Sequence, residues 1–245
     1  MKTPITYYGG KQQLAKKIIS LIPVHEIYCE PFIGGGAVFF QKQPSHSEII
    51  NDINGELINF YEVIQKDFSL LAQQISISLH SRELYRQARV VNENPEMFDR
   101  IKRVWAVWVL ANASFGANWD AGWGYDAAGE TTQKIANKRD SFTEELAIRL
   151  QNVQIESCDA LKIIRSRDRP ETFFYCDPPY PDTDQGHYDG YSSEDFRHLL
   201  ETLEHIQGKF LLSSFRHPVL MRCVHLREHV WIPVSIPFLH ASFPC

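Results

Sequence analysis

The 245-residue chain has an ordinary globular composition: 44% of its residues are hydrophobic and 22% are charged, and 25 Lys and Arg against 30 Asp and Glu give a formal net charge of −5. These values exclude collagen-like, disordered and disulfide-scaffold chains. The five cysteines include no C-x-x-C pair, which argues against a cysteine zinc site and predicts a reduced, cytoplasmic protein. No apolar run reaches the roughly 18 residues that a membrane helix requires, so we expect no membrane association.

Residues 11 to 65 alternate between helical and extended patterns. In chain order we expect a helix at 11–22, a strand at 27–30, a glycine-rich turn at 31–36 and a helix at 37–43. A strand at 48–51 and a helix at 54–65 follow. The second strand ends at Asp52, and Asn54 is suited to cap the helix that follows. This order of strand, glycine turn, helix, strand and acid predicts a βαβ unit.

The middle of the chain reads as successive helices, and strands return only after it. Helices are predicted at 67–80, 82–91 and 96–113, a polar segment rich in Gly and Trp at 114–130, strands at 152–157, 171–176 and 209–214, and a helix at 194–206. We therefore predict an α/β fold: a doubly wound, Rossmann-like domain of residues 1–53 and 149–245, split by a mostly helical insertion, residues 54–148. An insertion of this length normally has a function of its own.

The glycine turn has the pattern F-x-G-x-G, formed by Phe32, Gly34 and Gly36 after Glu30. Such a turn at the carboxyl end of a first strand lets the backbone approach a ligand closely. Both dinucleotides and S-adenosylmethionine (SAM) bind in this way. A nearby carboxylate suits SAM better, because SAM carries an ammonium and a sulfonium group but no pyrophosphate. Asp52 could accept the ribose hydroxyls of either ligand, and a tight turn without any ligand remains an alternative.

The segment Asp177-Pro178-Pro179-Tyr180 follows the apolar strand 171–176. The two prolines fix the backbone and remove two N–H donors, so an Asp carboxylate beside an outward carbonyl forms a pair of acceptors. Such a pair can grip a planar NH2 group such as adenine N6 and stabilise the positive charge that develops on its nitrogen during methyl transfer. Tyr180 offers a face on which an extruded base can stack. The alternative is a Pro-Pro turn that merely ends a strand.

Together, and in this order, these motifs resemble those of the Dam-type adenine-N6 DNA methyltransferases. Tyr7-Tyr8-Gly9-Gly10-Lys11 is similar to the N-terminal motif of that family, and Cys158-Asp159-Ala160 is similar to its contact with the SAM adenine. The resemblance implies SAM-dependent methyl transfer to adenine N6 in double-stranded DNA after base flipping, as in restriction–modification. It implies no metal and a monomer without an obligatory protein partner.

The resemblance also assigns roles residue by residue. The catalytic residues would be Asp177, Pro178 and Tyr180. The SAM-binding residues would be Tyr7, Lys11, Glu30, Phe32, Gly34, Gly36, Asp52, Asp159, Ala160 and Asp177. The helical insertion stands where the family has its target-recognition region, and its loop 112–130 would contact DNA. The DNA-binding residues would be Asn112, Phe115, Asn118, Trp119, Lys134, Lys138 and Arg139. Alternatively, the aromatic residues only anchor a long loop.

One departure from the family concerns the end of the chain. After the strand 209–214 the family continues through two antiparallel strands and a segment rich in Lys, Arg and Asn, which we do not recognise in this sequence. We therefore expect either a sheet that is closed differently or an altered C-terminus. This leaves open a catalytically impaired SAM-fold DNA-binding protein, and an RNA adenine-N6 methyltransferase is a further alternative. A NAD-dependent dehydrogenase is disfavoured, because it would not explain Asp177 to Tyr180.

Overall fold

A computed structural model describes the chain except residues 8, 120, 181–190, 215–228, 233–237 and 243–245; of 229–232 and 238–242 it describes the backbone. The chain forms two compact units. The helical unit comprises Met1–Gln12, Gly34–Gln41 and Asn54–Ile155, and the sheet unit comprises Gln13–Ile33, Lys42–Ile53 and Glu156–Cys245. Residues 1–12 and 34–41 therefore pack with the helices, although they belong to the predicted α/β domain by sequence.

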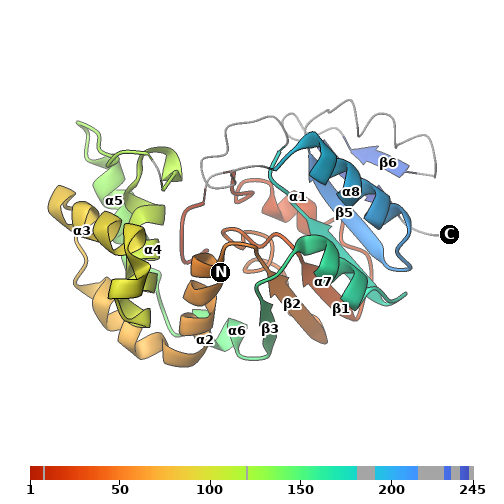
Figure 1. Cartoon of the computed structure of the whole chain (residues 1–245), viewed down its shortest axis with the longest axis horizontal. Helices are drawn as coiled ribbons and strands as arrows, with labels where there is room; N and C mark the ends of the chain where they lie inside the picture. Colours follow the sequence, from red (N-terminus) through yellow and green to blue (C-terminus); the bar gives the residue numbers. More distant parts are fainter. Residues whose placement is uncertain (8, 120, 181–190, 215–228, 233–237, 243–245) are drawn as a thin grey trace. The chain divides into compact units, whose positions relative to one another are not determined.

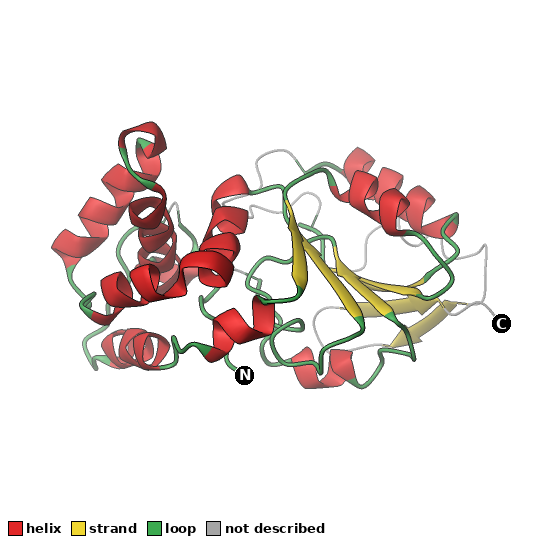
Figure 2. Cartoon of the chain, turned by 90° about the horizontal axis from the view of Figure 1, so that it is seen from below, coloured by secondary structure: helices red, strands yellow, loops and turns green. Residues whose placement is uncertain are grey.

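A single twisted sheet organises the strands (Figures 1 and 2). Its strands are β1 (Ile27–Glu30), β2 (Ser47–Asn51), β3 (Val153–Glu156), β4 (Thr172–Cys176), β5 (Lys209–Ser214), β6 (His229–Ile232) and β7 (Phe238–Ser242), in the order β3-β2-β1-β4-β5-β7-β6. β1 pairs in parallel with both β2 and β4, and β4 pairs in parallel with β5. The strand order reverses between β1 and β4, as in a doubly wound sheet, which confirms the predicted fold class.

The two faces of the sheet carry different sets of side chains because side chains alternate along a strand. One face packs under α7 (Ala160–Arg167) and α8 (Ser193–Glu204). Its buried apolar cluster contains Cys29, Ile49, Phe174, Cys176, Phe210 and Leu212 from the strands and Ile163, Ile164, Phe196, Leu199, Leu200 and Leu203 from the helices. The strand register places the polar side chains Tyr28, Glu30, Glu48, Tyr175 and Ser213 on the opposite face.

The helical unit contains α2 (Gly55–Ser76), α3 (Arg82–Glu93), α4 (Arg100–Ala113), α5 (Glu130–Asp140) and α6 (Glu145–Leu150). The predicted cap is confirmed, because the side chain of Asn54 accepts the N–H groups of Glu56 and Leu57, each at 3.1 Å. Two predicted helices form one helix that is kinked at Asp67. Asp99 caps α4, which begins four residues later than predicted since Pro95–Met97 forms a separate 3-10 turn.

Two local predictions near the N-terminus are wrong. The predicted helix 11–22 is reduced to α1, Ala15–Ile19. No helix forms at 37–43, where the backbone makes turns. Val38, Phe39 and Phe40 are all buried there, so the segment has no polar face of the kind that a surface helix presents.

The C-terminal strands that we did not recognise in the sequence are present. β7 pairs antiparallel with β5, and β6 pairs antiparallel with β7. An antiparallel strand can add to a mostly parallel sheet through the free backbone edge of β5. This pairing does not need the segment rich in Lys, Arg and Asn that the family carries. Within the described part of the chain, no helix combines the length and the apolarity needed to cross a bilayer.

Candidate functional site

A cavity of about 150 Å³ opens in the sheet unit, beyond the carboxyl ends of β1, β2 and β4. It is lined by Pro31, Phe32, Ile53, Asp159, Ala160, Leu161, Pro179, Tyr191 and Asp195. Ligands of doubly wound folds bind at this edge of the sheet, where the strand order reverses. Three of the predicted cofactor residues, Phe32, Asp159 and Ala160, therefore meet around one cavity, together with Pro179 of the predicted catalytic segment.

The wall of the cavity is mostly apolar, with a few polar groups at defined places. The rings of Phe32 and Tyr191 meet edge to face, with 6.5 Å between their centroids. Asp159 caps α7 by accepting the N–H of Lys162 at 3.0 Å. The hydroxyl of Tyr191 is buried and has no hydrogen-bond partner among the described residues. A flat group with polar edges, such as a purine, fits a cavity of this character.

Sequence reasoning missed several residues of this cavity. Ile53 and Leu161 adjoin predicted site residues, so their neighbours could have indicated them. Tyr191 carries no sequence signal, because it stands apart from every motif. Asn51 directly precedes the predicted site residue Asp52, and its side chain joins three of the loops around the cavity.

The glycine turn and the N-terminal motif meet within the helical unit. Gly34 and Gly36 adopt left-handed backbone angles, with φ of +47° and +67°. A Cβ atom added at Gly35 would lie 2.7 Å from the Cβ atom of Tyr7. The turn can therefore pack this closely against Tyr7 only with glycine at position 35. Lys11 is buried, and its ammonium donates to the carbonyl of Gly9 at 2.9 Å. Four of the predicted cofactor residues thus belong to this unit.

The acidic residues at the ends of β1 and β2 are buried in the sheet unit. Glu30 and Asp52 are each 2% exposed. Tyr28 donates its hydroxyl to Glu30 at 2.7 Å. Burial, and then the charge of Glu30, raise the pKa of the Tyr28 phenol, so this hydroxyl stays protonated and keeps donating to the carboxylate.

The Asp177 to Tyr180 segment follows β4 directly. Pro178 and Pro179 are buried, whereas Asp177 and Tyr180 are half-buried. Burial, followed by the charge of Asp177, raises the pKa of the Tyr180 phenol, and Ser213 of β5 interacts with that phenol. The carboxylate of Asp177 thus lies beside a protonated phenol at a partly open position, where it can accept hydrogen bonds from a ligand.

Three of the predicted DNA-binding side chains make contacts inside the helical unit. Asn112 accepts the N–H of Thr6 at 2.9 Å, and Trp119 is 5% exposed. The ammonium of Lys138 donates to the carbonyls of Thr3 and Ile5 at 2.8 and 3.0 Å. These DNA-binding roles come from the resemblance alone, and in the structure the N-terminal residues Thr6, Thr3 and Tyr7 contact Asn112, Lys138 and Trp119 respectively.

Of the remaining predicted DNA contacts, Phe115 and Asn118 lie on the loop 112–130, whereas Lys134 and Arg139 lie on α5. Phe115 is 71% exposed and Lys134 is exposed, whereas Asn118 is half-buried and Arg139 lies 3.5 Å from Asp140. An antiparallel bridge between Ser114 and Trp123 closes the loop. Trp123 stacks on Tyr125 with 5.2 Å between the ring centroids, and the guanidinium of Arg82 lies 4.4 Å from the Trp123 ring. These contacts at Ser114, Trp123 and Tyr125 hold the two ends of the loop segment that carries the exposed Phe115.

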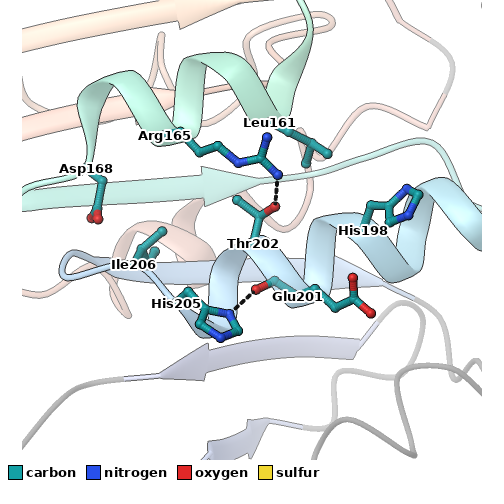
Figure 3. A pocket seen from close by; sticks show the side chains of 8 residues that line it. All are labelled: Leu161, Arg165, Asp168, His198, Glu201, Thr202, His205 and Ile206. Atoms are coloured by element: carbon teal, nitrogen blue, oxygen red, sulfur yellow. Dashed lines mark hydrogen bonds between the residues drawn. The ribbon is translucent and has the colours of Figure 1, made fainter.

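A larger hollow of about 560 Å³ lies between α7 and α8 (Figure 3). It is lined by Leu161, Arg165, Asp168, His198, Glu201, Thr202, His205 and Ile206. Arg165 donates to the hydroxyl of Thr202 at 3.1 Å, which joins the two helices across it. None of the predicted site residues lines it, and the described residues contain no group of three His, Cys, Asp or Glu side chains arranged for a metal ion. The smaller cavity is therefore the candidate site.

Comparison with known proteins gives consistent matches. The sequence model of the D12 class N6 adenine-specific DNA methyltransferases matches residues 7–235. A DNA adenine methylase of Salmonella typhi is 30% identical over 236 residues, which are 89% of this chain and 78% of that protein. The type II methyltransferase M.MjaIII of Methanocaldococcus jannaschii is 28% identical over 221 residues, 80% of this chain and 75% of that protein. The retron Ec67 DNA adenine methylase of Escherichia coli is 26% identical over 231 residues, 90% and 76% respectively.

Replacing Gly35 with Ala should destabilise the glycine turn. The new methyl group would lie 2.7 Å from the Cβ atom of Tyr7, and we expect the free energy of unfolding to fall by about 1–3 kcal/mol in urea titrations. Gly122→Ala is the matched control, because a Cβ atom there meets nothing within 4 Å. Equal stability of the two variants would contradict the close packing of Tyr7.

The burial of Lys138 should make stability depend on pH. Burial, and then the charge of Lys2, lower the pKa of this ammonium from 10.5 to about 8. Above pH 8 the folded chain releases this proton, whereas the unfolded chain keeps it until about pH 10.5. Since the unfolded state then binds more protons, the free energy of unfolding rises with pH across this window. Relative to Lys138→Met, the parent should gain stability between pH 8 and 10, and a constant difference would contradict the lowered pKa.

Proposed function

Because the chain belongs to the D12 class N6 adenine-specific DNA methyltransferase family, we propose that it transfers a methyl group from SAM to adenine N6 in double-stranded DNA, with the adenine flipped out of the helix. The observation that carries the proposal is the convergence of Phe32, Asp159, Ala160 and Pro179 on one cavity at the switch point of the sheet. This convergence brings the predicted cofactor and catalytic segments together.

The residues around the cavity fit the adenosine part of SAM. Phe32, Ile53 and Leu161 would enclose the adenine ring. The hydroxyl of Tyr191, which has no hydrogen-bond partner among the described residues, would donate to a ring nitrogen. Asp52, which ends the strand motif before Ile53, would accept the ribose hydroxyls. Tyr7, Lys11, Glu30, Gly34 and Gly36 are proposed as SAM contacts by the resemblance alone, with Lys11 toward the carboxylate end. When bound, SAM supplies a methyl group that its sulfonium charge has already activated.

Asp177 would hold the target amine. Its carboxylate would accept one N6–H bond while a backbone carbonyl of the proline pair accepts the other. Two acceptors draw the nitrogen lone pair out of conjugation and stabilise the positive charge that forms on N6. Tyr180 would stack on the extruded base, and its raised phenol pKa keeps the ring neutral beside Asp177.

The loop 112–130 would contact the duplex through its exposed part. Phe115 and Tyr125 are the exposed large apolar residues of this loop among those that the structure describes, and Lys134 follows it on α5. An exposed aromatic ring can stack on a base, and a lysine can neutralise a phosphate. We do not assign DNA contacts to Asn112, Trp119 or Lys138, because each of them is engaged within the helical unit.

Replacing Asp177 with Ala should remove methyl transfer while sparing the fold. We expect the rate to fall at least about a hundredfold, because an acceptor aimed at the developing charge is lost. Transfer of tritium from labelled SAM to plasmid DNA measures the rate, and a parallel assay on matched RNA tests the nucleic acid. Asp177→Asn keeps an acceptor oxygen and should fall between the parent and the Ala variant. A parent that binds SAM but labels no DNA would overturn the proposed reaction.

Replacing Phe115 with Ala should weaken DNA binding. The loss of one base-stacking ring is expected to raise the Kd for duplex DNA about tenfold, with the Kd for SAM unchanged. Met97→Ala is a matched control, since Met97 is a similarly exposed apolar residue of the same unit, at 73% against 71%. Fluorescence anisotropy with a labelled duplex measures both variants, and equal affinities would remove Phe115 from the interface.

A further inference from the structure

We propose that Asn51 is a positioning residue of the cofactor cavity, an inference that rests on the proposed function. Asn51 is the last residue of β2 and is 0% exposed. It is not one of the residues that line the cavity. Its side chain instead joins the loops that carry those residues.

The amide of Asn51 makes hydrogen bonds to two other loops. Its Nδ2 donates to the carbonyl of Pro31 at 2.9 Å and to the carbonyl of Cys158 at 3.0 Å. Its Oδ1 accepts the N–H of Cys158 at 3.0 Å and faces the thiol of that residue at 3.5 Å. The backbone carbonyl of Asn51 also accepts the N–H of Ile33 at 2.9 Å. One buried residue thus fixes peptides on both sides of it.

Each of the three joined loops contributes lining residues. Pro31 precedes Phe32 after β1, Asn51 itself leads to Ile53 after β2, and Cys158 precedes Asp159 and Ala160 after β3. The width of the cavity between Phe32, Ile53 and Asp159 therefore depends on hydrogen bonds made by one amide. Without them, the loops would still be joined by the bond from the Ile33 N–H to the Asn51 carbonyl and by the bond from the Ser157 hydroxyl to the Asp52 carbonyl. The carbonyls of Pro31 and Cys158 and the N–H of Cys158 would, however, lose the side chain that ties their loops to β2.

Only an amide of this length satisfies all of these partners. The two carbonyls require N–H donors, and the Cys158 N–H requires an acceptor. An aspartate would keep the acceptor but would turn a carboxylate oxygen toward two carbonyls. Alanine would leave the three backbone groups without the side chain that satisfies them.

The test compares Asn51→Asp and Asn51→Ala with Asp168→Ala, using the full-length chain. Asp168 is a matched control because it too joins loops of the sheet unit, accepting the N–H groups of Gln207 and Gly208 at 2.8 and 2.9 Å next to β5. It does not line the candidate cavity. Calorimetry gives the Kd for SAM, steady-state kinetics give KM and kcat, and thermal melting reports the stability of each variant.

We expect both Asn51 variants to raise the Kd and the KM for SAM about tenfold or more, since each loses buried hydrogen bonds. The kcat at saturating SAM and the KM for DNA should change much less. Asp168→Ala should lower the melting temperature and leave the Kd for SAM unchanged. The proposal is overturned if the Asn51 variants bind SAM as tightly as the parent. It is also overturned if they lose only stability and kcat, which is what a purely structural role of Asn51 would produce.

A second measurement needs no cofactor. Alkylation of Cys158 by iodoacetamide, followed by peptide mass spectrometry, reports how firmly its loop is held. The alkylation of Cys158 should be faster in the Asn51 variants than in the parent and in Asp168→Ala. An unchanged alkylation rate would contradict the role of Asn51. The parent protein could also fail to bind SAM while Cys158 is still alkylated faster in the Asn51 variants. That result would overturn the cofactor assignment, and Asn51 would then only hold the loops together.

Discussion

The double pairing of β1 is the constraint on which the rest of the sheet unit depends. β1 lies in parallel between β2 and β4, so the carboxyl ends of all three strands reach the same edge. The chain leaves β1 toward one side of the sheet and later returns to its other side, and the loops after these strands diverge. A cavity at that edge follows from the strand order, and the side chains of the loops decide what it can bind.

The alternation of side chains then places different groups on the two faces of the sheet. Cys29, Phe174 and Cys176 point into the apolar cluster beneath α7 and α8, while Glu30 and Tyr175 point to the other face. If a strand slipped by one residue in its pairing with its neighbour, its side chains would exchange faces of the sheet. The buried apolar contacts therefore hold the register that keeps the acidic groups at the ends of β1 and β4 in place.

The sequence could predict what local rules decide. The cap at Asn54, the strand ends and the convergence of Phe32, Asp159 and Ala160 follow from short patterns and from parallel topology. It could not predict the engagement of Lys138 with Thr3, because that contact spans 135 residues of the chain. The C-terminal hairpin was missed for a similar reason: its strands pair through the backbone, and no side-chain motif marks the partner edge.

The ring contacts of Trp123 make its fluorescence a reporter of the loop 112–130. Trp105, Trp108 and Trp119 are at most 5% exposed, whereas Trp123 is half-buried, with Tyr125 against its ring and the Arg82 cation over it. Indole emission is sensitive to neighbouring rings and charges, so a disturbance of this loop would alter the emission of Trp123, and of Trp119 on the same loop, more than that of Trp105 and Trp108 on α4. The DNA contact proposed for this loop would therefore be visible in tryptophan emission without an attached dye.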